Sequence, residues 1–168
     1  LRGRGGLRPV KPERRVRIGD MLVQEGELTE PQLRLALDEQ KQSGRKLGTI
    51  LVDKGFIDED RFLLFLSKQF GLPFVDLRRR ELDPAFARQL AETQARRYKA
   101  LLLGTEDGRA LVGMVDPMDI FAVDDIGRLL QRPVQPAVVR ESELLAAQDL
   151  VYRRTDDIAT FAEALEVE

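Results

Sequence analysis

Two glycines, Gly19 and Gly48, each follow a basic and an aliphatic residue at the start of an apolar helical pattern. The first turn of a helix carries free backbone N–H groups and a positive partial charge, which attract an anion. A glycine at this place lets a ligand approach the backbone closely. Arg17 and Lys46, two residues before each glycine, are placed to meet a phosphate or to stack on a base. These residues indicate noncovalent binding of an anionic ligand.

Both glycines lie in a 24-residue pattern that occurs twice, over residues 17–40 and 46–69, at an offset of 29 residues. Eight of the 24 aligned positions are identical. Each copy ends in a glutamine, Gln40 or Gln69, whose amide can both donate and accept hydrogen bonds. Two related half-sites suit a ligand that has two phosphates and two rings. A cyclic dinucleotide has that symmetry.

The apolar residues between each glycine and glutamine have two interpretations. Leu33 and Leu37 in the first copy, and Phe62 and Leu66 in the second, offer flat apolar surface to a ring. The same side chains can instead form a core, with the glycines serving only to end or cap helices. The residue types leave both interpretations open, and the duplication favours a ligand.

Each copy predicts a helix, a glycine stop and a second helix. Gly26 and Gly55 stand where a C′ glycine ends a helix. Thr29 then caps the second helix, with Gln32 completing a capping box, and Asp58 is the corresponding cap in the second copy. A repeat of this kind is usually one supersecondary unit that cannot bury its apolar face alone. We therefore expect four short helices in a compact bundle.

After residue 71 the pattern changes to short apolar runs that alternate with amphipathic helices. Asp83 and Pro84 open one of these helices, and Pro136 marks an edge or a bulge in a strand. A turn over 106–108 joins the first two strands. The expected elements are an extended run over 72–77, helices over 84–90, 92–97, 119–131 and 142–151, and strands over 100–103, 110–115 and 133–139.

The expected fold class is α+β, with an N-terminal four-helix tandem-repeat bundle followed by a small α/β sandwich subdomain. The first fifteen residues hold six bases and one acid, whereas the last thirteen hold five acids and no base. We divide the chain into a flexible basic arm, the tandem-motif helical subdomain, the α/β subdomain and a C-terminal linker helix capped by Thr155. Their expected ranges are 1–15, 16–72, 73–153 and 154–168.

Composition narrows the possible chemistry. The 168 residues are 43% hydrophobic and 33% charged, and the net charge of −2 gives no bulk attraction to nucleic acid. The chain has no cysteine and no histidine, which excludes disulfides, a zinc site built on those residues and a Ser-His-Asp triad. No GxxxxGK[ST] phosphate loop occurs, so we expect no catalysis and no metal in this chain. Because it does not begin with Met, we expect it to be a piece of a longer protein.

Over residues 17–69, the two copies with their five-residue spacer resemble the tandem motif of the MshEN domain. This is the N-terminal regulatory domain of type II secretion and type IV pilus assembly ATPases, the GspE/PilB/MshE group. The runs over 71–77 and 115–117 resemble the second half of the same region, so the resemblance covers most of the chain.

The resemblance implies that the chain binds cyclic di-GMP through both motifs. Lys46 stands where the family has an arginine, which loses bidentate and stacking contacts, and Phe62 replaces a leucine. The residues that we expect to contact the ligand are Arg17, Ile18, Gly19, Asp20, Leu22, Leu33, Leu37, Gln40, Lys46, Leu47, Gly48, Thr49, Leu51, Phe62, Leu66 and Gln69.

The resemblance also implies partners and a location. The partners are the C-terminal ATPase motor domain of the same chain and inner-membrane secretion or pilus platform proteins, with no nucleic acid polymer. The location is cytoplasmic, peripheral to the inner membrane through those partners. The full-length protein is then expected to be an ATPase. The alternative function is a protein–protein docking module that anchors the ATPase to its partner without binding nucleotide.

Overall fold

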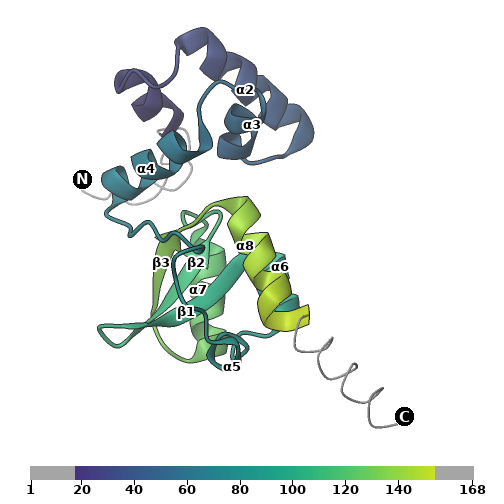
Figure 1. The fold of residues 1–168 in the computed structure, drawn as a ribbon. Helices are drawn as coiled ribbons and strands as arrows, with labels where there is room; N and C mark the ends of the chain where they lie inside the picture. The colour runs from purple at the N-terminus through teal and green to yellow at the C-terminus, as the bar shows by residue number, and fades with distance from the viewer. Residues whose placement is uncertain (1–17, 154–168) are drawn as a thin grey trace, which may run out of the picture. The chain divides into compact units, whose positions relative to one another are not determined.

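The computed structural model describes residues 18–153, which form two compact units with the boundary after Phe65 (Figure 1). The first unit is helical and the second contains a small sheet packed with helices, which confirms the predicted α+β fold class. The boundary falls inside a helix, α4, whose last residues from Leu66 onward belong to the second unit. The expected basic arm over 1–15 and the expected helix over 156–165 lie outside the described residues.

The tandem repeat forms two helix–glycine–helix segments, as its pattern predicts. The first has helical residues 18–24 followed by α2 (Glu30–Ser43). The second has α3 (Leu47–Asp53) followed by α4 (Glu59–Phe70). Thr29 caps α2 in the expected capping box: the Gln32 N–H donates to Thr29 Oγ1 at 3.3 Å, and the Thr29 N–H donates to Gln32 Oε1 at 3.0 Å.

The first helix of each copy ends in the same backbone hydrogen bonds. The Glu27 N–H donates to Leu22 O and the Phe56 N–H donates to Leu51 O, both at 2.9 Å. The glycines between them, Gly26 and Gly55, have φ values of 79° and 74°, a left-handed conformation that favours glycine. The N–H of each glycine donates to the carbonyl three residues before it, Val23 O or Val52 O, as in the Schellman motif. The sequence repeat is therefore also a repeat of backbone geometry.

The second unit is built on a three-stranded sheet with the order β1-β2-β3. Strand β1 (Ala100–Glu106) pairs antiparallel with β2 (Arg109–Met114), and β2 pairs parallel with β3 (Val134–Val138). Asp107 and Gly108 turn the β1–β2 hairpin with φ values of 53° and 78°. The expected extended run adds to the sheet beside β3, because the Val75 N–H donates to Val138 O at 2.9 Å.

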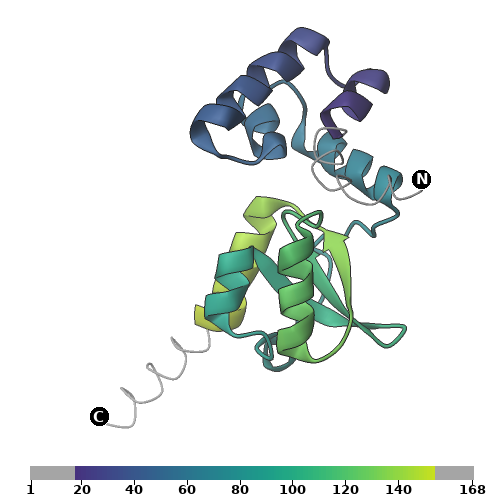
Figure 2. The ribbon, with the colours of Figure 1, turned by 180° about the vertical axis from the view of Figure 1, so that it is seen from behind.

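Helices cover the strands of this sheet (Figure 2). Helix α7 (Ile120–Leu130), capped by Asp119, connects β2 to β3 and packs against β3. Helices α6 (Glu92–Tyr98) and α8 (Glu141–Gln148) pack against β1 and against each other. The short helix α5 (Pro84–Ala87) also packs against β1, and a π-helical turn, Asp149–Arg153, follows α8.

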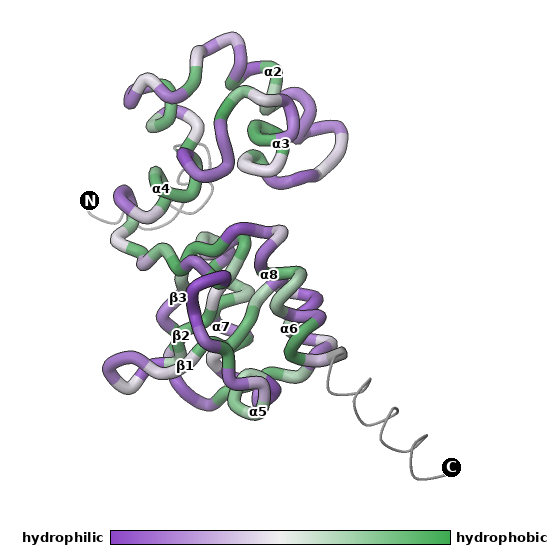
Figure 3. The backbone as a smooth tube through the Cα atoms, viewed as in Figure 1, coloured by the Kyte–Doolittle hydropathy of each residue, from purple (hydrophilic) through white to green (hydrophobic). Residues whose placement is uncertain are grey.

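The core of the second unit is apolar along β1 and β2 (Figure 3). Two polar side chains enter this core from the C-terminal helix. Gln148 is fully buried, and its Nε2 donates to Ala95 O at 3.0 Å and to Ala100 O at 2.9 Å. The buried Tyr152 hydroxyl donates to Leu90 O at 2.6 Å. Both side chains thus place their polar atoms in hydrogen bonds with backbone carbonyls inside the core.

Two helix predictions are corrected, and one alternative for Pro136 is confirmed. The helix expected over 84–90 ends at Ala87, because the chain then turns so that the Leu90 carbonyl accepts from Tyr152. The helix expected over 142–151 changes to a π-helical turn after Gln148, whose side chain is held by the two carbonyls named above. Pro136 was predicted to mark either an edge strand or a bulge, and it lies in the edge strand β3. The irregularity in strand register lies in β1, between Leu102 and Gly104.

Candidate ligand-binding site

Gly19 and Gly48 lie where the two helices of each copy approach most closely. A Cβ on Gly19 would lie 2.5 Å from Leu33 Cδ1, and a Cβ on Gly48 would lie 2.5 Å from Phe62 Cε2. Leu33 and Phe62 occupy the same position in the two copies. The missing side chain of each glycine therefore makes room for the apolar residue at the equivalent place in the next helix.

Besides Gly19, four of the predicted contact residues are buried in the described structure. Leu22 and Leu51 are 0% exposed, Leu66 is 3% exposed and Leu33 is 8% exposed. In this conformation these side chains contribute to packing and present almost no surface to a ligand. Contact between them and a ligand stays a prediction, and it requires the helices to separate or rotate.

The remaining predicted residues present surface to different degrees. Arg17 lies outside the described residues, and Leu66 and Gln69 lie on the part of α4 that belongs to the second unit. Among the others, Gly19 is buried and Asp20 and Lys46 are exposed. The half-buried set, which is placed best to contact a ligand, is Ile18, Leu37, Gln40, Leu47, Gly48, Thr49 and Phe62.

The side chain of Gln40 is oriented by the spacer between the copies. Its Nε2 donates to Arg45 O at 3.1 Å, and the Arg45 N–H donates to Ser43 Oγ at 3.2 Å. Gly44, with a φ of 74°, ends α2 and allows this turn. Because the amide nitrogen is used by the backbone, Gln40 Oε1 is the atom of this side chain that is placed to accept a bond from a ligand.

An ion-pair network, which the sequence repeat does not reveal, joins α2 to the end of α3. Glu39 pairs with Lys54 at 2.8 Å and with Arg45 at 3.3 Å, and Arg45 also pairs with Asp53. The hydrogen bond from the Lys54 ammonium holds the pKa of Glu39 below its usual value. Sequence reasoning missed this network because neither Glu39 nor Arg45 has a matching partner in the other copy. Arg45, the residue before Lys46, is therefore engaged in ion pairs within the first unit.

The starts of α2 and α3 differ in capping. Thr29 caps α2 with its side chain, whereas Lys46 occupies the N-cap of α3 and makes no side-chain cap hydrogen bond. The first N–H groups of α3 are therefore left without an acceptor from the N-cap side chain. An anion at this end would meet both these groups and the charge of Lys46.

Two further findings concern metals and membranes. Between residues 18 and 153, no group of three or more His, Cys, Asp or Glu side chains is arranged to hold a metal ion. In the same range, no helix combines the length and the apolar character needed to cross a membrane.

Comparison with solved structures finds proteins that are similar in fold to this chain. The structure of MshE with cdg (cyclic di-GMP) is 37% identical to this chain, with a TM-score of 0.71, and the match covers 80% of this chain and 98% of that one. The N-terminal domain of XpsE is 25% identical with a TM-score of 0.64, and the match covers 82% of this chain and 93% of that one.

Curated relatives are pilus ATPases of greater length. The type IV pilus assembly ATPase PilB of Myxococcus xanthus is 32% identical over 136 residues, which are 81% of this chain and 24% of that protein. PilB of Thermus thermophilus is 31% identical over 133 residues, which are 78% of this chain and 15% of that protein. The chain thus spans a quarter or less of the length of these relatives.

The family match and the pairwise matches cover different parts of the chain. The match to the MshEN domain family extends over residues 70–158, which contain the sheet unit rather than the tandem motif. The 136 residues that align with the Myxococcus protein must also include part of the tandem motif, because only 99 residues of this chain follow residue 69. Since the family match covers more than half of the chain, this chain belongs to the MshEN domain family.

Proposed function

We propose that this chain is a cyclic di-GMP-binding regulatory domain of a type IV pilus or type II secretion assembly ATPase. The observation that carries the proposal is the exact backbone recurrence of the two copies, with the same helix ends and the same glycine contact in each. A ligand made of two identical halves matches such a pair. The likeness to the structure of MshE with cdg supports this choice of ligand.

The proposed binding is noncovalent and divides the ligand between the copies. Arg17 and Lys46 neutralise phosphate charge, together with the uncapped first turn of α3. The half-buried Leu37 and Phe62 cover the guanine rings. Gln40 Oε1 accepts from one guanine, and Gln69 has the corresponding role in the second copy.

Binding would act on a motor domain through conformation rather than chemistry. A ligand that bridges both copies favours the arrangement in which both half-sites are formed. Coupling of this kind is typically about 1–3 kcal/mol. The partners that we propose are the ATPase motor of the same protein and the platform proteins of the secretion or pilus system, at the cytoplasmic side of the inner membrane.

The burial of the leucines favours one alternative, in which the repeat serves as packing and the domain only docks the ATPase to a partner. Leu22 and Leu51 are as buried as core residues of any small domain. This alternative predicts a folded chain that takes up no cyclic di-GMP. It is separated from the proposal by binding measurements alone.

Isothermal titration calorimetry of the 168-residue chain with cyclic di-GMP tests the proposal. We expect one ligand per chain at micromolar affinity or tighter, and much weaker binding of GMP because it engages one half-site. Gln40→Ala is expected to weaken binding by about tenfold through loss of one ligand hydrogen bond. Lys46→Arg is expected to strengthen it, because a guanidinium can bind phosphate in a bidentate manner.

Gln42→Ala is the matched control, because Gln42 is an exposed glutamine on the same helix two residues from Gln40 and outside the predicted contacts. It should leave the affinity unchanged. A folded chain that releases no heat with cyclic di-GMP would refute the proposal. Equal affinities for the Gln40→Ala and Gln42→Ala variants would refute the assigned role of Gln40.

A further inference from the structure

The second unit contains an open groove of about 780 Å³ between the segment 77–84 and the α8 helix with its π-helical extension. One wall is formed by Leu77, Leu82 and Pro84, and the other by Ala146, Ala147 and Leu150. Leu150 is 41% exposed, although it faces other apolar residues across the groove. An apolar groove of this kind is suited to the large side chains of an amphipathic segment.

The segment wall of the groove carries excess positive charge. Arg78 and Arg80 line this wall, and Arg79 lies between them in the chain without lining the groove. Arg78 pairs with Asp76 at 3.3 Å and with Glu143 at 2.9 Å, whereas the Arg79 side chain is 87% exposed and reaches Asp76 only at 3.7 Å. Arg80 donates to a backbone carbonyl at 3.4 Å and, within residues 18–153, pairs with no carboxylate. The wall therefore favours an acidic occupant.

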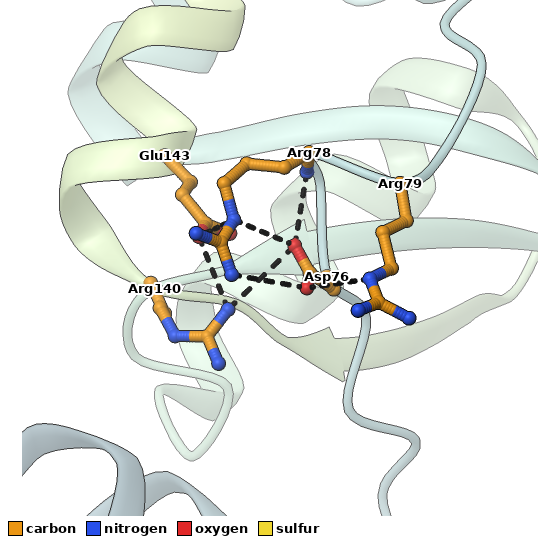
Figure 4. Close-up of polar contacts among 5 residues, drawn as sticks. All are labelled: Asp76, Arg78, Arg79, Arg140 and Glu143. Atoms are coloured by element: carbon orange, nitrogen blue, oxygen red, sulfur yellow. Dashed lines mark hydrogen bonds and ion pairs between the residues drawn. The ribbon is translucent and has the colours of Figure 1, made fainter.

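Glu143 in the helix wall has an unused acceptor (Figure 4). Its side chain is only 10% exposed, and its Oε2 accepts from Arg78 and from Arg140 at 3.1 Å. Its Oε1 is buried and has no hydrogen-bond partner among the described residues. Glu143 is thus held in the helix wall by two guanidinium groups and is the one acid among the residues that line the groove.

We propose that this groove is the docking site for residues 154–168 of the same chain. This segment contains five acids, Asp156, Asp157, Glu163, Glu166 and Glu168, against one base, Arg154, so its net negative charge complements the arginine wall. Its large apolar residues, Ile158, Phe161 and Leu165, are spaced at i, i+3 and i+7, the spacing of one helical face.

The length and the starting point of the segment fit this placement. It begins four residues after Leu150, which already lines the groove. The helix wall from Ser142 to Leu150 is about 12 Å long at 1.5 Å per residue. Fifteen residues are enough for a short reversal and a helix of that length antiparallel to α8. The docking does not rest on cyclic di-GMP binding, since none of the residues that line the groove is a predicted ligand contact.

Because the chain has no cysteine, a single introduced cysteine can carry a spin label that tests the docking directly. A nitroxide attached to the 168-residue variant Ala162→Cys broadens the amide NMR signals of residues near it. The docked segment predicts broadening of residues 77–82 and 142–147, which lie far from residue 162 in sequence. Broadening confined to residues close to 162 in sequence would overturn the proposal.

Substitutions in the labelled chain identify the contacts. Phe161→Ser removes the central apolar side chain and should abolish the broadening of residues 77–82, whereas the matched control Thr160→Ser should retain it. Arg80→Glu should weaken it by reversing a charge that faces the acids. Chemical shifts in the remainder of the second unit report whether each variant is folded. If the broadening of residues 77–82 is the same in the Phe161→Ser variant as in the parent, the assigned docking is wrong.

Discussion

Replacement of Gly48 by alanine is expected to destabilise the first unit, and removal of the Phe62 ring is expected to reverse the sign of that effect. The new Cβ would lie 2.5 Å from Phe62 Cε2 and 2.6 Å from Cζ. Overpacking of this kind costs about 1–3 kcal/mol. The greater helix propensity of alanine offsets about 1 kcal/mol of that cost. The net destabilisation of Gly48→Ala is then about 1 kcal/mol, from the difference of the two effects.

In a Phe62→Ala background the steric cost is absent and the helix propensity remains. Gly48→Ala should then stabilise the unit by about 0.5–1 kcal/mol, so the coupling between the two substitutions is about 1–3 kcal/mol. Gly55→Ala is the matched control. A Cβ there meets nothing within 4 Å, and its cost arises from a φ of 74°, so it should destabilise both backgrounds equally.

Amide hydrogen exchange of α3 and α4 residues measures the free energy of opening in each variant. The two tyrosines of the chain, Tyr98 and Tyr152, both lie in the second unit, so tyrosine fluorescence serves as an internal reference that should not change. If Gly48→Ala has the same effect with and without the Phe62 ring, the glycine does not serve close packing and the reasoning fails.

Three further predictions concern the second unit. Gln148→Leu should lower its free energy of unfolding by about 1–3 kcal/mol in urea titrations, because the Ala95 and Ala100 carbonyls each lose a hydrogen bond inside the core. Burial raises the pKa of Tyr152 to about 12, whereas the tyrosine of the unfolded chain releases its proton near pH 10. The free energy of unfolding should therefore fall between about pH 10 and 12. Tyr152→Phe should remove part of this fall. The hydrogen bond from Arg78 lowers the pKa of Asp76 in the folded state, so the ionised carboxylate stabilises the fold at any pH above its ordinary pKa. This contribution is lost as the pH falls through the lowered pKa of the folded state. Asp76→Asn should therefore make the free energy of unfolding depend less on pH in the acid range.

The helices of the repeat could be predicted from sequence because their signals are local. A glycine at a left-handed position, such as Gly26, and a capping box at Thr29 act within one turn of the chain. The β1–β2 hairpin around Val112 could also be predicted from sequence, because two short apolar runs joined by a turn with Gly108 are typical of paired strands.

Features that depend on contacts distant in sequence could not be predicted. The early end of α5 depends on Tyr152, which lies more than sixty residues away from the Leu90 carbonyl that it binds. The role of Gly48 in packing depends on the approach of Phe62, which the repeat suggests only as a pattern. The same limitation applies to the candidate site. The sequence predicted both Gln40 and Leu22 as ligand contacts, but in the structure the Gln40 amide is accessible and Leu22 is buried in the core.

The central claim is that the two copies bind one ligand together. Amide NMR spectra of the 168-residue chain recorded during a titration with cyclic di-GMP test it most directly. We predict that residues around Gly19 and residues around Gly48 shift with one dissociation constant and reach saturation at one ligand per chain. Shifts confined to one copy, different constants for the two copies, or no shift in either copy would contradict the claim.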